Sequence, residues 1–92
     1  MRFTLKASRD VIGNKIDLKI LRSGSQLIAQ VDTELDTFKL GSDQLSEPSV
    51  HFERHFRQAG EAGPGMEHTL VVKATDTDGN SEVATKIWLD ET

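Results

Sequence analysis

Short runs in which apolar and polar residues alternate constrain the fold of this chain more than any other feature. In the clearest run, residues 15–20, Ile16, Leu18 and Ile20 alternate with two lysines and an aspartate. Successive side chains of a β-strand point to opposite faces, so this period of two predicts a strand with one buried face. Several such runs, separated by turns rich in glycine, predict an all-β fold.

The first alternating run is followed by a second, which predicts a hairpin over residues 15–32. The connection contains Gly24, which adopts a positive φ at little cost. After it, Leu27, Ala29 and Val31 repeat the alternation. We therefore predict that these two strands pair with each other.

A second hairpin is predicted over residues 68–89. Two alternating runs flank the sequence Asp-Thr-Asp-Gly-Asn, and Asp-Gly and Gly-Asn pairs between such runs are typical of hairpin turns. The predicted inward face of this hairpin consists of Leu70, Val72, Ala74, Val83, Thr85, Ile87 and Leu89. This assignment places Trp88 on the outer face of the sheet.

The rest of the chain shows weaker signals. Residues 3–7 alternate and predict a strand, and residues 10–14 hold turn residues. Residues 33–48 lack a clear period, and we predict a turn at Gly41-Ser42-Asp43. In residues 43–59, Val50, Phe52 and Phe56 fit one face of a strand.

A helical stripe of Phe52, Phe56 and Ala59 is the alternative for residues 43–59, and we prefer the strand because the rest of the chain is β. Residues 59–67 carry three glycines and a proline, which predict a loop. About seven short antiparallel strands at roughly ten-residue spacing predict an immunoglobulin-like β-sandwich. At 92 residues, the chain 1–92 is expected to form a single domain.

Composition excludes several classes of function. With no cysteine, the chain has no disulfide framework, no thiolate metal site and no cysteine nucleophile. A formal net charge of −4 is unlike the basic surface of a nucleic-acid binder. No apolar run reaches the roughly 18 residues of a membrane helix, so no membrane insertion is expected. The first residues do not have the pattern of a signal peptide. Two interpretations of the chain remain, a complete cytosolic protein or, as we expect, a domain of a longer secreted chain.

Two histidines form the first candidate metal site. On a helix, His51 and His55 would lie one turn apart, a spacing suited to zinc, although Glu53 does not match the His-Glu-x-x-His pattern. On a strand, they share a face but stand about 13 Å apart, too far for one ion. We interpret them as part of a solvated strand face opposite Phe52 and Phe56.

The hairpin turn at residues 76–80 is the second candidate, because Asp76 and Asp78 cluster oxygen ligands of the kind that calcium prefers. An EF-hand loop would need glutamate at its twelfth position, which here is Ile87. We interpret the segment as a turn in which Asp and Asn bond the nearby backbone. The sequence therefore predicts no metal site.

No catalytic or cofactor-binding residues are predicted. No serine lies in a Gly-x-Ser-x-Gly motif, and a sandwich this small leaves little room for a closed pocket. Arg54, Arg57 and Lys86 are too dispersed to form a basic patch. Trp88 is the one large aromatic residue that could anchor a partner or stack on a sugar, and we interpret it instead as packing in the core or at an edge.

The segment 68–89 resembles the last hairpin, strands F and G, of bacterial immunoglobulin-like modules. The matching residues are His68, Leu70, Val72, Ala74, Asp76, Gly79 and Asn80. The segment 15–32 lies where such a module has its strands B and C. The resemblance implies a β-sandwich and, since such modules have unrelated functions, no particular activity.

The resemblance and the composition together predict a non-catalytic structural, adhesion or spacer module of a larger bacterial surface or secreted protein. Its partners would be adjacent modules of the same chain or a protein partner. One alternative is a small free-standing domain that binds proteins through a sheet edge. Another is an accessory carbohydrate-binding domain that uses Trp88. We expect an extracellular, cell-surface or periplasmic location, with the cytoplasm as the alternative.

Overall fold

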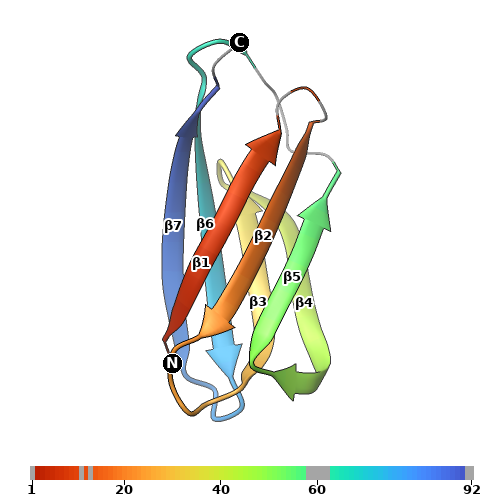
Figure 1. Cartoon of the computed structure of the whole chain (residues 1–92), viewed down its shortest axis with the longest axis vertical. Helices are drawn as coiled ribbons and strands as arrows, with labels where there is room; N and C mark the ends of the chain where they lie inside the picture. The colour runs from red at the N-terminus through yellow and green to blue at the C-terminus, as the bar shows by residue number, and fades with distance from the viewer. Residues whose placement is uncertain (1, 11, 13, 58–62, 91–92) are drawn as a thin grey trace.

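Two antiparallel β-sheets pack face to face in the computed structural model of this chain (Figure 1). The structure describes residues 2–10, 12, 14–57 and 63–90. Its strands are β1 (Phe3–Asp10), β2 (Lys15–Arg22), β3 (Ile28–Leu35), β4 (Phe38–Ser49), β5 (His51–Phe56), β6 (Glu67–Asp76) and β7 (Ser81–Leu89). No helix that could cross a membrane occurs in these described ranges.

The strands divide unequally between the two sheets. Sheet A has the order β1-β2-β5, and sheet B has the order β4-β3-β6-β7. All neighbouring strands are antiparallel. This arrangement confirms the predicted all-β, immunoglobulin-like sandwich of seven strands.

The core lies between the sheets and follows the alternation of the sequence. From β2, Ile16, Leu18 and Ile20 point inward and are almost completely buried. The other buried apolar side chains are Ile28, Val31, Leu35, Phe56, Leu70, Val72 and Ala74. Burying one large aliphatic side chain contributes about 1.5–3 kcal/mol, so this set supplies the main driving force for folding.

The predicted hairpin over residues 15–32 is wrong, although both of its strands exist. β2 belongs to sheet A and β3 to sheet B, so the connection around Gly24 crosses from one sheet to the other. β2 pairs instead with β1 and β5. Alternation shows that a strand has a buried face, and two strands that face each other across a core alternate in the same way as two that pair.

The alternation at the start of β3 is also shifted. Against β6, the register changes between Ile28 and Gln30, which leaves Ala29 as an extra residue on β3. As a result Ile28 is fully buried. The pattern of Leu27, Ala29 and Val31 instead predicts that Leu27 and Ala29, on either side of Ile28, are the buried residues. A bulge of this kind reverses which face the following residues occupy.

The turn predicted at Gly41-Ser42-Asp43 is wrong, because these residues lie inside β4. The chain turns earlier, at Asp36 and Thr37, which have φ values of 51° and 73°. Gly41 instead lies close to Phe56 of sheet A. A Cβ at position 41 would lie 3.1 Å from Cε1 of Phe56, a contact that would require the ring to move by a few tenths of an ångström.

The inward face predicted for the second half of hairpin 68–89 is also wrong. The hairpin itself is confirmed, and Leu70, Val72 and Ala74 are buried as predicted. On β7, however, Val83, Ile87 and Leu89 are 55%, 58% and 63% exposed. Ala84 lies opposite Val72, and Trp88 lies opposite His68. Ala84 and Trp88 are therefore the residues of β7 that share the inward face with these buried side chains. The outward side of β7 is the more apolar one, and alternation by itself does not distinguish the two sides.

Residues 43–56 are strand and not helix, as preferred from the sequence, and the break at Val50 is a corner at which the chain passes from sheet B to sheet A. Of the loop predicted at 59–67, residues 59–62 lie outside the described residues. Gly65, with a φ of 74°, belongs to the predicted loop, and Glu67 already begins β6.

Candidate functional site

A buried histidine at the start of β6 is the centre of the most polar cluster in the interior. His68 is 1% exposed. Its Nδ1 lies 2.7 Å from Oδ2 of Asp36, and its Nε2 lies 2.8 Å from Oδ2 of Asp90. Arg9 of β1 completes the group, with Nε 3.2 Å from Oδ1 of Asp90. We call these four residues the His68 cluster.

Each carboxylate of the cluster is held by backbone as well as side-chain bonds. Asp36, in the β3–β4 turn, accepts a hydrogen bond from the amide of Thr69, whose carbonyl accepts one from the amide of Asp36. Asp90, directly after β7, exchanges backbone hydrogen bonds with Gly65 and Met66. The cluster therefore joins strands from both sheets to the segment that leaves β7.

Hydrogen bonds explain why the buried part of this cluster is tolerated. Desolvation raises the pKa of both Asp36 and Asp90, but hydrogen bonds outweigh it and leave each pKa below its usual value. The amide of Thr69 and the ring of His68 act on Asp36, and His68 and the amide of Gly63 act on Asp90. The guanidinium of Arg9 places a positive charge beside Asp90.

The cluster is suited to holding segments together rather than to chemistry on a substrate. The side chains of Arg9, His68 and Asp90 are at most 2% exposed. No serine, threonine hydroxyl or other nucleophile bonds His68 among the described residues. From the sequence, His68 could be found as a polar residue in an inward-facing position, but Arg9, Asp36 and Asp90 lie too far away in the sequence to be identified as its partners.

The two histidines considered as a zinc site lie on a solvated strand face, as the strand interpretation predicted. His51 and His55 are exposed on the outer face of β5. Nδ1 of His55 is 2.6 Å from Oδ1 of Asp17, its cross-strand partner on β2. The structure therefore brings His55 to a carboxylate and does not bring it to His51.

The acidic hairpin turn has the backbone bonds expected of a turn. Oδ1 of Asp76 accepts hydrogen bonds from the amides of Asp78 and Asn80, at 2.9 and 3.0 Å. Gly79 has a φ of 86° and donates its amide to the carbonyl of Asp76. Asp76 is 3% exposed, so this carboxylate organises the turn from within.

Trp88 is half-buried and packs against the core. It is thus not on the outer sheet face, where it would be open to a flat ligand, and the interpretation of Trp88 as core packing applies. The most exposed aromatic residue is Phe38, at 76%, beside the β3–β4 turn.

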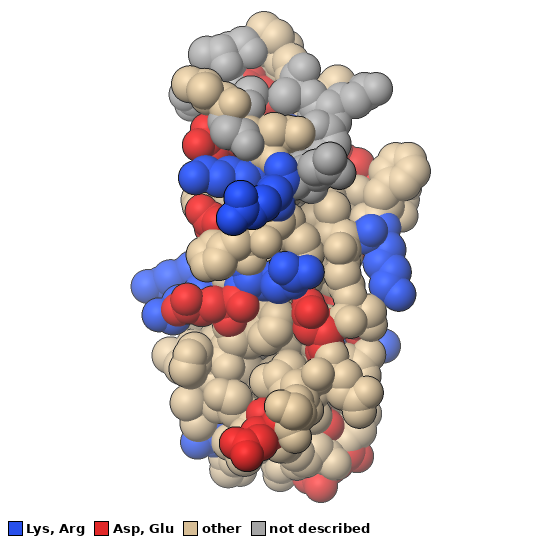
Figure 2. Space-filling model, turned by 90° about the vertical axis from the view of Figure 1, so that its right-hand side faces the viewer, with Lys and Arg blue, Asp and Glu red and all other residues tan. Residues whose placement is uncertain are grey.

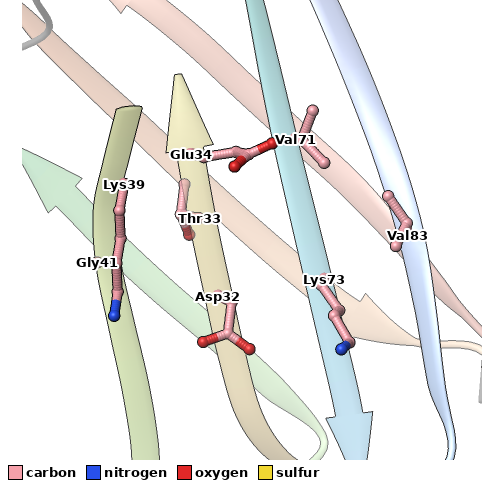
Figure 3. Close-up of a pocket in the computed structure, with 8 residues that line it drawn as sticks. All are labelled: Asp32, Thr33, Glu34, Lys39, Gly41, Val71, Lys73 and Val83. Atoms are coloured by element: carbon pink, nitrogen blue, oxygen red, sulfur yellow. The ribbon is translucent and has the colours of Figure 1, made fainter. Parts of the chain in front are cut away.

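The outer face of sheet B carries a surface hollow of about 360 Å³ (Figure 3). Its lining residues are Asp32, Thr33, Glu34, Lys39, Gly41, Val71, Lys73 and Val83. The charges alternate in sign, with Asp32 opposite Lys73 and Glu34 opposite Lys39 on neighbouring strands. A hydrogen bond from Ser42, together with these lysines, lowers the pKa of Asp32. The two acidic and two basic residues that line the hollow therefore balance in formal charge.

Charged side chains of both signs adjoin across the middle of the side on which β4 and β5 lie, and most of the remaining surface there is uncharged (Figure 2). Nε of Arg54 lies 3.4 Å from Oδ2 of Asp43, which joins the inner faces of the two sheets at this edge. Nζ of Lys19 lies 3.5 Å from Oε1 of Glu53 on the outer face of sheet A. On the face shown in Figure 2, side chains of opposite charge therefore lie next to each other.

No protein-family model matches the chain, and no curated protein matches it in sequence. Among solved structures, it is similar to the fibronectin(III)-like modules of Clostridium thermocellum CbhA, with a TM-score of 0.54 and 21% sequence identity. The alignment covers 96% of this chain and 97% of that one. The similarity extends over the whole sandwich and confirms the resemblance to bacterial immunoglobulin-like modules at the level of the fold.

Proposed function

We propose that residues 1–92 form a single non-catalytic module that acts as a spacer within a larger bacterial surface or secreted protein. The observation that carries this proposal is the placement of the first and last strands. β1 begins at one end of the long axis and β7 ends at the other (Figure 1). The molecule measures 41 × 20 × 18 Å, so a chain that enters at β1 and leaves after β7 advances by nearly the full length of the module.

The His68 cluster supports the same role, because it fixes the direction in which the chain leaves. Asp90 follows β7 directly and is bonded through both its backbone and its side chain. The residue after β7 is therefore tied by several bonds to β1, to β6 and to the segment before β6. The similarity in fold to fibronectin(III)-like modules of a bacterial protein also supports a place beside other modules.

Small-angle X-ray scattering of tandem chains tests the proposal. Chains of two, three and four copies, joined end to end, are measured at low concentration. If the module is a spacer, the maximum dimension grows by close to 41 Å with each copy. A maximum dimension that grows much more slowly would show modules folded back on one another and would contradict the spacer role.

A protein-binding domain that uses a sheet edge is the second candidate. It is favoured by the apolar outward side of β7, an edge strand of sheet B. The accessory carbohydrate-binding alternative depended on Trp88 at the outer face, and the inward position of this residue removes that support.

A further inference from the structure

The four edge strands of the sandwich differ in how they resist pairing with another chain. β4 contains Pro48 and irregular register with β3, and β5 has only six residues with alternating charges. β1 presents Lys6 and Asp10 on its outer side. β7 is nine residues long, contains no proline and keeps an unbroken register with β6. Long, regular edges with apolar side chains are those that accept a further strand.

The inward side of this edge carries two charges that lack a partner. Glu82 and Lys86 lie opposite Ala74 and Leu70, and both are exposed. Neither forms an ion pair with any residue in the described part of the chain. They stand four residues apart on one strand, about 13 Å, which is too far for them to pair with each other.

The geometry of antiparallel strands turns these two charges into a self-complementary pair. If Ala84 lies opposite Ala84 of a second copy, Glu82 lies opposite Lys86 of that copy, and Lys86 lies opposite its Glu82. Side chains directly opposite each other have Cβ atoms about 5 Å apart, close enough for an ion pair. A two-fold axis through Ala84 therefore creates two identical ion pairs.

Other registers lose this match. Centring the pair on Lys86 places two lysines opposite each other, which is unfavourable. Centring it on Val83 or Thr85 leaves both Glu82 and Lys86 opposite uncharged residues. An inward-facing charge on an edge strand normally disfavours pairing with another strand. Here Glu82 and Lys86 disfavour each of these registers except the one centred on Ala84.

The outward side chains fit the same register. Val83 lies opposite Thr85 of the second copy and diagonal to its Val83 and Ile87, within reach of apolar contact. The exposed apolar residues of the two β7 strands, Val83, Ile87 and Leu89, become one continuous stripe across the joined sheets. We propose that β7 pairs antiparallel with β7 of a second copy of this chain, in the register centred on Ala84.

Charge reversal tests the proposal, measured by sedimentation equilibrium over a range of concentrations. The wild-type chain is expected to dimerise with a Kd on the order of 100 µM, as befits a small interface. Lys86→Glu and Glu82→Lys each place like charges opposite each other, and each is expected to weaken the dimer at least about tenfold. The double variant Glu82→Lys/Lys86→Glu restores the pairs and is expected to return to within about threefold of wild type. Circular dichroism confirms that the single variants remain folded.

A single cysteine tests the register, since the chain has none of its own. Ala84→Cys is expected to give a disulfide-linked dimer on oxidation. Ser81→Cys is the control, because in this register the two copies of residue 81 lie about 20 Å apart. A wild-type chain that stays monomeric near 1 mM, single variants that dimerise as well as wild type, or equal cross-linking at both positions would each overturn the proposal.

Discussion

Trp88 lies directly opposite His68 in the β6–β7 ladder, and both side chains face the core. The indole thereby covers the inner side of the strand pair next to the buried imidazole, while the apolar residues on either side of it, Ile87 and Leu89, face solvent. The strand with the most apolar sequence thus contributes chiefly Trp88 to the interior.

Truncating Trp88 should therefore cost far more than truncating its neighbour. We expect Trp88→Ala to lower the free energy of unfolding by about 2–4 kcal/mol, because it opens space beside the core. Ile87→Ala is the matched control, and it should change the free energy by less than about 0.5 kcal/mol. Urea unfolding of both variants measures the difference, and a larger loss for Ile87→Ala would show that β7 is turned over.

The same comparison on β6 tests the face that the sequence predicted correctly. Val72 is completely buried, and Lys73 lies on the outer face. Val72→Ala should cost about 1–3 kcal/mol. Lys73→Ala should stay within about 0.5 kcal/mol. Equal effects in thermal or urea unfolding would contradict the observed orientation of sheet B.

Acid should destabilise the domain through the His68 cluster. The pKa of Asp36 and that of Asp90 are lowered from 3.8 in the folded chain, so the unfolded chain takes up these protons first as the pH falls. Their contribution to stability is complete above about pH 4 and is lost as the pH falls through the lowered values. Tm measured from pH 6 to 2 should fall steeply below about pH 4.

Asp36→Asn separates this cluster from other acidic groups. The variant should be less stable than wild type at pH 6 and should lose less Tm between pH 4 and pH 2, because one of the two titrating groups is gone. A wild-type Tm that is flat over this range, or a variant with the same slope as wild type, would contradict the role given to Asp36.

Thr37→Gly should stabilise the β3–β4 turn. Thr37 has a φ of 73°, a conformation that a β-branched side chain adopts only with strain and that glycine adopts freely. We expect a gain of about 1 kcal/mol after the greater flexibility of the unfolded glycine chain is taken into account. Thr37→Ala, which keeps a Cβ, should give a smaller gain in urea unfolding, and a loss of stability with glycine would contradict the argument.

Calcium and zinc should change the Tm very little. Asp76 already accepts two backbone amides, and His51 and His55 point outward along one strand. Calorimetry with each ion measures the shift. A saturable increase of several degrees that Asp76→Ala or His51→Ala abolishes would reveal a metal site that neither the sequence nor the structure indicates.

Local signals in the sequence predicted the strands well, because alternation depends only on one strand and its buried face. They did not determine which strands pair. β2 and β3 alternate as a hairpin would, yet five residues carry the chain across the core, and the choice depends on packing between sheets. The turn at Asp36 was missed since Asp-Thr is not a common hairpin turn, and the hydrogen bonds of Asp36 to Thr69 that hold it come from a distant strand.

The His68 cluster shows a further limit of sequence analysis. Four polar residues separated by up to 81 positions in the sequence meet in one place. The position of each side chain is explained only by its bonds to the others. The side of β7 that faces inward could not be assigned for a similar reason. Its more apolar side looks like the core until the register with β6 is known, because the buried Leu70 and Val72 of β6 lie opposite Lys86 and Ala84.

The opposite placement of the chain's entry and exit has a mechanical consequence. A force applied at the start of β1 and the end of β7 acts along the strands (Figure 1). Each of the two strands is then pulled in shear past its own neighbour, β1 past β2 and β7 past β6, so many hydrogen bonds must yield together instead of one after another. The clamp on Asp90 keeps the end of β7 from peeling away first. Resistance to such a force is set by the rate of unfolding rather than by the free energy of folding, so bonds that contribute little to equilibrium stability can decide how long the domain holds under tension.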